Sequence, residues 1–481
     1  MFDFCNLSPR GYTVVKEKLT SNQIQEIRKD LTVKPFVNTD FGAQSQPFAV
    51  YGESARKLYI PRFYGIAKFG DPYISKLDAP EEVDVSFTKE LRPIQRPIVD
   101  TYMAEATKKS TGGGGIISVP CGYGKTVLAL NIMAQLGVKT LIVVHAEFLM
   151  NQWKERIEQF VSGAKLGKIQ GKVVKTKDKN IVIGMLQTLC KKDFPEDTFK
   201  GFGLVIYDEC HHLGAEVFSK ALLKTNFKYL LGLSATPKRT DGLSKVFEWY
   251  LGPMVYVIKK RSEETVDVKV IKYKNNDEAY SKERFNQMGK PMMSTMINNI
   301  TQFEPRTEII INEIKTNIEE GRKILLLSDR RDHLREIKDK LDATEITSGF
   351  YLGGMKPRDL QETEECQVIL GTFSMASEGF DCKYPLHSII LASPKTSIEQ
   401  AVGRILRQEA SKREKTPRII DIHDSFSLFT NQCRKRMDFY KKNKYNIMIY
   451  NEKVELIESH PNPGNPPSSE GSSSSFVDDD D

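Results

Sequence analysis

The chain has 481 residues, enough for about three globular domains that can each bury a core. With 40% hydrophobic and 28% charged residues, it has an ordinary globular composition, which excludes collagen-like and wholly disordered proteins. No apolar run approaches the roughly 18 residues of a membrane-spanning helix, and the first residues lack the order of a signal peptide, so we expect a soluble intracellular protein that does not bind membranes.

The net charge is +7, and residues 461–481 contain five acidic but no basic residues, so the rest of the chain carries +12. A basic excess of this kind suits a polyanionic partner such as nucleic acid. The seven cysteines form no C-x-x-C pair, which argues against a disulfide framework and a zinc ribbon. A reducing compartment is therefore expected.

Residues 1–85 are predicted to form a small α+β domain. Thr20 or Ser21 can cap a helix, and residues 57–69 (KLYIPRFYGIAKF) are strand-like. Charged and aromatic residues alternate here, as expected if the charges neutralise a nucleic-acid backbone and the aromatic rings stack on bases. A sheet with a buried aromatic face has the same pattern and is the alternative. The residues are Arg56, Lys57, Tyr59, Arg62, Phe63, Tyr64 and Lys68.

Apolar strand-like runs alternate with helical patterns over residues 86–258 and again over 311–455, which predicts two parallel α/β sheets flanked by helices. Residues 259–310 are polar and are expected to connect the two lobes, and residues 456–481 are expected to form a disordered acidic tail. The predicted strands are Ile116–Val119, Leu141–Val144, Ile181–Ile183, Leu204–Tyr207, Tyr229–Leu233, Ile324–Leu327, Val368–Leu370, Ile389–Leu391 and Ile419–Ile422.

A glycine-rich loop, PCGYGKT, follows the first strand of the first sheet and precedes a helical pattern. This order directs backbone N–H groups and the helix dipole at phosphate, with the lysine on the β and γ phosphates and the threonine hydroxyl on Mg²⁺. A chance glycine-rich loop is the alternative. The residues expected to contact nucleotide are Cys121, Gly122, Tyr123, Gly124, Lys125 and Thr126.

Two carboxylates follow the strand LVIY, in the sequence DECHH. The carboxyl end of a strand faces the ligand crevice of an open α/β sheet, so Asp208 can orient Mg²⁺ while Glu209 polarises the attacking water. A zinc site made of Cys210, His211 and His212 is the alternative, and three adjacent residues converge poorly on one tetrahedral ion.

Taken in order, PCGYGKT, DECH, LSAT and QAVGRILR resemble the motif series of superfamily 2 helicases, over about residues 86–450. The strings LRPIQ and QAVGRILR are similar to the XPB-like branch. LSATPKRTDG and FYKKNKYNI are similar to poxvirus transcript-release helicases and their relatives in large cytoplasmic DNA viruses. The resemblance implies two tandem RecA-like lobes and the use of ATP and Mg²⁺.

The resemblance also implies roles for single residues. Gln95 would read the adenine through its amide, and Arg404 and Arg407, one turn apart on a helix with Gln400, would act on the γ-phosphate. Gly379 and Asp381 fall in a motif that touches nucleotide. The residues implied to contact nucleic acid or couple it to ATP are Gln187, Thr188, Ser234, Ala235, Thr236, Arg239 and Thr372, with Tyr351, Gly353 and Gly354 on the backbone. Ordinary loop capping is the alternative for Gln187 and Thr188 and likewise for Tyr351, Gly353 and Gly354.

Two positions depart from the family pattern. Ala401 stands where many relatives have arginine, and Arg239-Thr240-Asp241 replaces the Arg-Glu-Asp triplet of XPB-like enzymes. We therefore expect intact ATP hydrolysis and less efficient strand separation.

These observations predict a monomeric ATP-driven motor that moves 3′ to 5′ on DNA in viral transcript release, repair or recombination. RNA polymerase or other transcription machinery is the expected protein partner, and the host cytoplasm (the viral factory) or the virion is the expected location. The alternatives are an RNA helicase, a double-stranded DNA translocase without strand separation, an ATPase with no nucleic-acid track, and an inactive DNA-binding scaffold.

Overall fold

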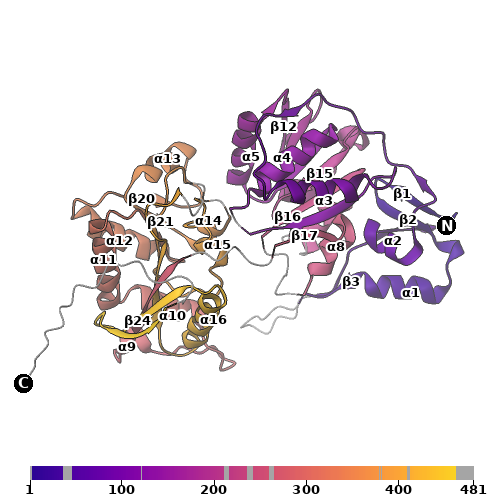
Figure 1. The fold of residues 1–481 in the computed structure, drawn as a ribbon. Coiled ribbons are helices and arrows are strands. Elements are labelled where there is room, and N and C mark those ends of the chain that lie inside the picture. The colour runs from indigo at the N-terminus through magenta and orange to yellow at the C-terminus, as the bar shows by residue number, and fades with distance from the viewer. Residues whose placement is uncertain are drawn as a thin grey trace, which may run out of the picture. The chain divides into compact units, whose positions relative to one another are not determined.

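The computed structural model describes residues 3–35, 46–120, 122–210, 216–235, 242–258, 265–378, 380, 382–408 and 412–461. The chain divides into two compact units, Met1–Lys259 and Lys260–Asp481 (Figure 1). None of the helices in the described ranges has the length and hydrophobicity that crossing a bilayer requires.

The first unit begins with a five-stranded sheet in the order β5-β6-β2-β1-β7. A capping box at Thr20 starts the first helix, because its hydroxyl accepts from Gln23 N and the Gln23 side chain accepts from Thr20 N. The elements of this part are β1 (Cys5–Ser8), β2 (Gly11–Val15), α1 (Ser21–Asp30), β3 (Thr32–Val33), β4 (Phe48–Ala49), β5 (Gly52–Glu53), β6 (Lys57–Ile60), α2 (Arg62–Phe69), β7 (Ile74–Ser75) and β8 (Ser86–Phe87).

The strand-like prediction for residues 57–69 is wrong beyond Ile60. Pro61 precedes helix α2, whose buried residues Arg62, Gly65 and Phe69 recur at helical spacing. The aromatic and β-branched residues of this segment have strand propensity, and burial of one helical face overrides it.

The main sheet of the first unit has eight strands in the order β13-β12-β14-β10-β15-β16-β9-β17. All neighbouring strands are parallel except β12 and β13, which confirms the predicted parallel α/β lobe. Its strands are β9 (Gly114–Ser118), β10 (Thr140–Val144), β12 (Leu166–Gln170), β13 (Val173–Lys175), β14 (Ile181–Met185), β15 (Leu204–Tyr207), β16 (Tyr229–Ser234) and β17 (Met254–Val257), and a short β11 (Val161–Ser162) pairs with β8.

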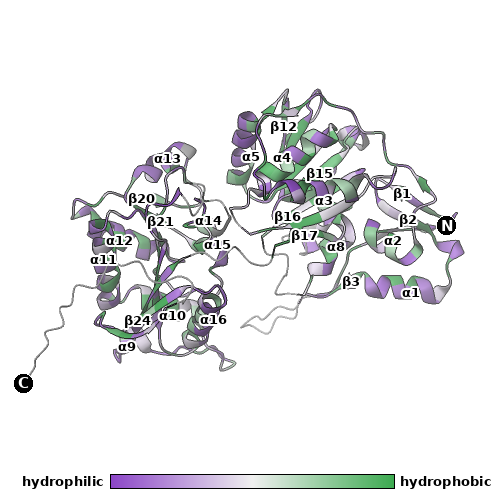
Figure 2. Ribbon diagram, in the orientation of Figure 1, coloured by the Kyte–Doolittle hydropathy of each residue, from purple (hydrophilic) through white to green (hydrophobic). Residues whose placement is uncertain are grey.

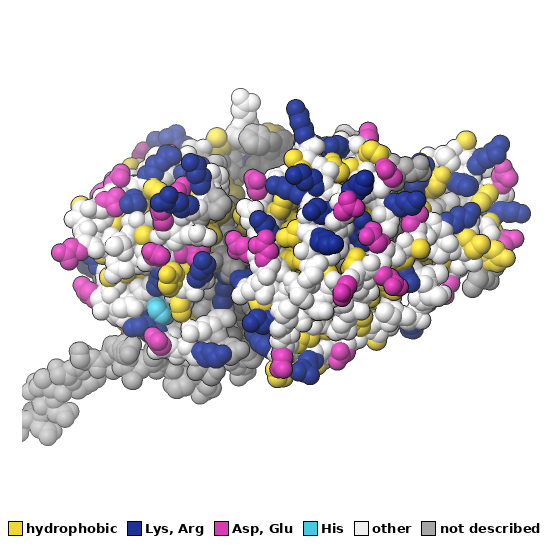
Figure 3. Space-filling view, turned by 90° about the horizontal axis from the view of Figure 1, so that it is seen from above, with side chains coloured by type: hydrophobic (Ala, Val, Ile, Leu, Met, Phe, Trp, Pro, Cys, Tyr) yellow, Lys and Arg dark blue, Asp and Glu magenta, His cyan; other side chains and the backbone are white. Residues whose placement is uncertain are grey.

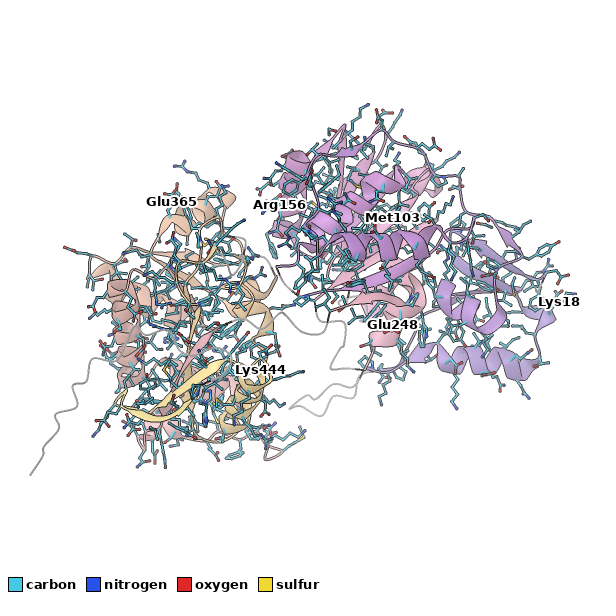
Figure 4. All side chains as sticks on the ribbon, viewed as in Figure 1. Lys18, Met103, Arg156, Glu248, Glu365 and Lys444 are labelled. Atoms are coloured by element: carbon cyan, nitrogen blue, oxygen red, sulfur yellow. The ribbon has the colours of Figure 1, made fainter. Side chains whose placement is uncertain are left out.

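Helices cover both faces of this sheet, because side chains that alternate along a strand enter different cores. Ile142 and Val144 pack in a core with α3, α4 and α5, whereas Leu141 and Val143 pack in a core with α6, α7 and α8. Met103 on α3 and Glu248 on α8 mark the two faces (Figure 4), and the strands between them are hydrophobic (Figure 2). The helices are α3 (Arg96–Thr107), α4 (Lys125–Leu136), α5 (Glu147–Phe160), α6 (Leu186–Lys191), α7 (Glu216–Leu222) and α8 (Ser244–Leu251).

The N-terminal sheet shares the second of these cores with the main sheet. Tyr12, Ile27 and Leu58 belong to the same buried cluster as Phe247 and Tyr250 of α8. Residues 1–85 are therefore packed against the first lobe through a common apolar core.

Arg62 is the polar centre of this packing. Its side chain is 2% exposed, and its guanidinium donates to the carbonyl oxygens of Phe227 and Lys228 at 3.1 Å and of Thr111 and Gly112 at 3.1 and 2.8 Å. Burial lowers the pKa of Arg62 to about 10. This residue, which the sequence offers as a nucleic-acid contact, is thus a structural one.

The second unit has an eight-stranded sheet in the order β20-β21-β19-β22-β23-β18-β24-β25, parallel except for β24 and β25. Its strands are β18 (Asp267–Tyr273), β19 (Ile324–Leu327), β20 (Ser348–Tyr351), β21 (Val368–Gly371), β22 (Ser388–Leu391), β23 (Arg418–Asp424), β24 (Asn446–Tyr450) and β25 (Leu456–His460). Its helices are α9 (Glu278–Ser281), α10 (Met293–Thr301), α11 (Glu304–Glu319), α12 (Arg331–Asp342), α13 (Pro357–Glu365), α14 (Phe373–Glu378), α15 (Glu399–Val402) and α16 (Phe429–Lys442).

Four strands of this sheet have no counterpart among the predicted strands: β20 and β24 lie inside the predicted second lobe, and β18 and β25 lie outside it. Strand β18 falls in the expected connector and lies between β23 and β24. Its buried Val268 and Val270 alternate with lysines, so the segment has no continuous apolar run that would predict a buried strand. Strand β25 falls in the expected tail and pairs with β24, with every side chain exposed. The rest of the acidic tail, from residue 462, lies outside the described residues.

Candidate functional site

The phosphate loop connects β9, an inner strand of the first sheet, to α4. Gly122 and Gly124 have φ angles of 89° and 78°, which favour glycine because a side chain is strained there. Gly124 is the N-cap of α4 and Lys125 is its first residue. The loop therefore presents the first N–H groups of a helix, as an anion site requires.

Gln95 holds this loop in place. Its Nε2 donates to Tyr123 O at 2.8 Å and its Oε1 accepts from Arg92 N at 2.9 Å, while Arg92 Nη2 donates to Gly122 O at 3.1 Å. A Cβ at Gly124 would lie 2.6 Å from Gln95 Nε2, so a side chain there would displace Gln95. Both residues belong to the LRPIQ string, and the sequence analysis gave a role to Gln95 but none to Arg92.

The two predicted carboxylates lie beside the phosphate loop, directly after β15. Lys125 Nζ and Glu209 Oε1 form a 2.9 Å ion pair, with side-chain exposures of only 12% and 14%. Asp208 Oδ1 accepts from Glu209 N at 3.0 Å, and Asp208 Oδ2 accepts from Trp153 Nε1 of α5 at 2.9 Å. The structure thus brings Lys125, Asp208 and Glu209 together, and adds Trp153.

The electrostatics of this cluster favour a cation. Burial raises the pKa of Asp208, Glu209 adds to the rise, and Lys125 and Trp153 oppose it. Two carboxylates against one ammonium leave a negative site. Glu209 also has a φ of 45°, a strained conformation for a residue other than glycine and one that clusters at functional sites.

The sequence relatives of the chain identify its family. A family model described as "Type III restriction enzyme, res subunit" matches residues 88–239. The chain is 37% identical over 451 residues to "Putative ATP-dependent RNA helicase L396" of Acanthamoeba polyphaga mimivirus, covering 92% of this chain and 86% of that protein. The chain belongs to the superfamily 2 helicases.

A second viral relative agrees with this assignment. "Putative ATP-dependent RNA helicase QP509L" of African swine fever virus (isolate Tick/South Africa/Pretoriuskop Pr4/1996) is 28% identical over 354 residues, with 68% of this chain and 67% of that protein covered. A solved structure, "The crystal structure of T4 UvsW", covers 94% of this chain and 99% of that chain at 18% identity and a TM-score of 0.35. By its sequence relatives, the chain is an ATP-hydrolysing enzyme of a helicase family with members in large DNA viruses.

The cluster suits the ATP that this helicase family uses and an accompanying Mg²⁺. Thr126, the second residue of α4, and Asp208 offer the oxygen ligands that Mg²⁺ prefers, and Lys125 with the start of α4 offers positive charge to a triphosphate. When bound, ATP would supply the phosphoryl group and Mg²⁺ would neutralise part of its negative charge. The described residues contain no group of three or more His, Cys, Asp or Glu side chains that could hold a metal. His211 and His212 of the zinc alternative, and Cys121 of the loop, lie outside the described residues.

The predicted coupling residues of the first lobe are only partly described. Ser234 ends β16 and is buried, and its carbonyl accepts from Val119 N at 3.2 Å, next to the phosphate loop. Ala235 follows Ser234 directly, whereas Thr236 and Arg239 lie outside the described residues.

Gln187 and Thr188, which the resemblance assigns to nucleic-acid contact, make hydrogen bonds within the first unit. Gln187 Nε2 donates to His145 O at 2.6 Å, and Thr188 Oγ1 accepts from Gly171 N at 2.9 Å. Gln187 Oε1 is buried and has no hydrogen-bond partner among the described residues. The hydrogen bond of Thr188 thus agrees with the loop-capping alternative. The side-chain oxygen of Gln187 can accept a further hydrogen bond.

In the second unit, the arginines of QAVGRILR do not lie on one helix as predicted. Helix α15 ends at Val402, and residues 403–406 continue as turns. Arg404 is 9% exposed and donates to Ala376 O; Arg407 Nη2 donates to Phe380 O at 2.5 Å. Both arginines therefore bind the segment after β21.

The remaining predicted residues of the second unit surround that segment. Thr372 follows β21, and its hydroxyl lies 3.2 Å from Ser374 Oγ. Gln400 lies within α15 and is half-buried. Gly379 and Asp381 lie outside the described residues.

Proposed function

We propose that this helicase is a nucleic-acid-stimulated ATPase that moves 3′ to 5′ along one strand of DNA. The observation that carries the proposal is the partly buried ion pair of Lys125 and Glu209 beside Asp208 at the start of α4. A triphosphate brings more negative charge to Lys125 than Glu209 does, so its binding draws the ammonium to phosphate. Glu209 is then released to accept a proton from the attacking water.

Other residues have roles in this proposal, most of them predicted from the sequence. Gln95 contacts the adenine as well as the loop. Thr372 and Gly353 bind the nucleic-acid backbone, and Arg404 and Arg407 act in ATP hydrolysis once they leave their carbonyl partners. Trp153 orients Asp208 through their hydrogen bond.

The choice of DNA and of direction rests on the resemblance to the XPB-like branch. RNA is the second candidate track, because the mimivirus and African swine fever virus relatives carry RNA helicase in their names. On the face shown in Figure 3, lysine and arginine side chains mix with aspartate and glutamate. Viral transcript release is the proposed task, with transcription machinery as the partner and DNA repair or recombination as the alternative.

Steady-state ATP hydrolysis with single-stranded DNA, duplex DNA and RNA as separate stimulators tests the proposal. We expect DNA to stimulate turnover, and apparent affinity to fall steeply with salt as counterions are released. Stimulation by RNA alone would replace DNA with the second candidate. A hydrolysis rate that no polynucleotide changes would contradict the motor altogether.

A further inference from the structure

An exposed apolar cluster lies between α9 and α10 in the second unit. Four of the large hydrophobic side chains that are exposed among the described residues fall within residues 285–293. Phe285 is 52% exposed, Met288 60%, Met292 40% and Met293 39%. Such a concentration of exposed apolar side chains in so short a segment marks an interaction site rather than the scattered exposure of an ordinary surface.

The segment is a short hairpin held by its own hydrogen bonds. Phe285 pairs antiparallel with Pro291, Asn286 N donates to Lys290 O at 2.9 Å, and Met292 N donates to Arg284 O at 2.6 Å. At the tip, the Asn286 side-chain oxygen accepts from Met288 N at 3.0 Å. The apolar tip is therefore presented by an ordered turn.

Arg330 fixes the base of the hairpin to the sheet. Its Nη2 donates to both the carbonyl and hydroxyl oxygens of Ser294 at 3.0 Å, and its Nε donates to Asn298 of α10. Arg330 follows β19 by three residues. The hairpin is thus anchored close to the carboxyl end of an inner strand.

That end of the sheet is the one where the proposed nucleic-acid contacts lie. Strands β19, β20 and β21 are parallel and in register, with Leu327 and Tyr351 both opposite Gly371. Thr372 and Gly353 therefore follow strands that end at the same edge as β19. Strand β18, which leads into α9 and the hairpin, also ends there, because it is parallel to β23 and β23 is parallel to β22.

We propose that the hairpin Arg284–Met293 separates strands by placing Phe285 and Met288 against the bases at a duplex junction. The ligand is the terminal base pair, and the inference rests on the proposed function. Apolar side chains can insert between base steps, at a cost of a few kcal/mol of unstacking, and aromatic rings stack on bases of any sequence. Arg284 and Lys290 flank the tip and can neutralise phosphates.

The location favours a polynucleotide over a protein as the occupant. The hairpin shares its sheet edge with Thr372 and Gly353, and basic residues flank its apolar tip. A protein partner is the competing outcome of the test below.

A double variant, Phe285→Ser with Met288→Ser, in the full chain tests the inference. The matched control is Leu456→Ser with Ile457→Ser on β25 of the same unit, whose side chains are 58% and 56% exposed. Two rates are measured on each preparation: ATP hydrolysis stimulated by single strands, and ATP-driven displacement of a duplex with a 3′ single-stranded tail. We expect the hairpin variant to displace strands at least tenfold more slowly, with stimulated hydrolysis within twofold of wild type and both rates unchanged in the control.

A second readout follows the junction base itself. With 2-aminopurine at the junction, wild-type protein should raise its fluorescence by unstacking it, and the hairpin variant should not. Normal displacement by the hairpin variant, or an equal loss of hydrolysis and displacement, would overturn the inference and leave a protein partner for this surface. If no polynucleotide stimulated ATP hydrolysis by the wild-type protein, the proposed function would be wrong, and the proposed role of the hairpin would be wrong as well.

Discussion

Replacing Arg62 with methionine tests whether this residue joins the N-terminal sheet to the first lobe. The substitution keeps a long flexible side chain and removes the donors of the hydrogen bonds to Phe227, Lys228, Thr111 and Gly112. The side chain is 2% exposed, so the carbonyls that lose their donor are left largely without water. Each such group costs about 1–3 kcal/mol.

The net effect is smaller than the sum of these costs, because removing a buried cation also removes its desolvation penalty. We expect the free energy of unfolding of the first unit to fall by about 3 kcal/mol. With a urea dependence of about 3 kcal/mol per molar, the unfolding midpoint should move down by about 1 M.

Tryptophan fluorescence during urea unfolding reports on the first unit and therefore measures this shift. Both tryptophans, Trp153 and Trp249, lie in the first unit, and Trp249 makes an edge-on ring contact with Tyr64 of α2 at 5.7 Å. Arg56→Met, at an exposed position of the same segment, is the matched control and should unfold like wild type. If Arg62→Met also unfolded like wild type but bound polynucleotide several-fold more weakly, Arg62 would be a nucleic-acid contact and the structural role would be refuted.

Three further predictions concern single features of the two units. Trp153→Phe removes the hydrogen bond to Asp208, so the Mg²⁺ concentration for half-maximal hydrolysis should rise about tenfold; an unchanged Mg²⁺ titration would contradict this role. His333 is buried, and its burial, with the charge of Arg306, lowers its pKa to about 3. Below about pH 6.5 the unfolded state therefore binds a proton at this histidine that the folded state does not bind. As the pH is lowered from 6.5 to 4, the free energy of unfolding should fall by about 1.4 kcal/mol per pH unit. Urea unfolding followed by tyrosine circular dichroism should show that His333→Gln flattens this dependence, and an equally steep dependence in the variant would contradict it. Deleting residues 1–85 exposes the core that they share with α8, so the remainder should lose cooperative unfolding by tryptophan fluorescence; a soluble fragment that unfolds cooperatively would contradict the shared core.

The clustering of Lys125, Asp208 and Glu209 was predictable, because these residues belong to short contiguous motifs. A glycine loop between a strand and a helix, and two carboxylates after a strand, identify Lys125, Asp208 and Glu209 without any knowledge of packing. Trp153 was not predictable, because it reaches Asp208 from a helix 55 residues earlier in the chain and no local pattern marks an indole as a hydrogen-bond donor.

The parallel sheets were predictable from apolar runs, and the exceptions have physical reasons. In β18, buried valines alternate with lysines, so the run reads as polar. In α2, a helix made of residues with strand propensity is stabilised by burial of Arg62 and Phe69 in the interior of the first unit. Sequence alone gives the charge of Arg62 but not its burial, and burial decides between a nucleic-acid contact and a structural one.

Measuring nucleotide binding and hydrolysis together in Glu209→Gln tests the central claim that the Lys125–Glu209–Asp208 cluster hydrolyses ATP. The amide keeps the size of the side chain and loses the base, and general-base catalysis contributes about 10²–10⁴ in rate. The account predicts that Glu209→Gln binds a fluorescent ATP analogue within about threefold of wild type, while polynucleotide-stimulated turnover falls at least 100-fold. Turnover at the wild-type rate in this variant would contradict the account.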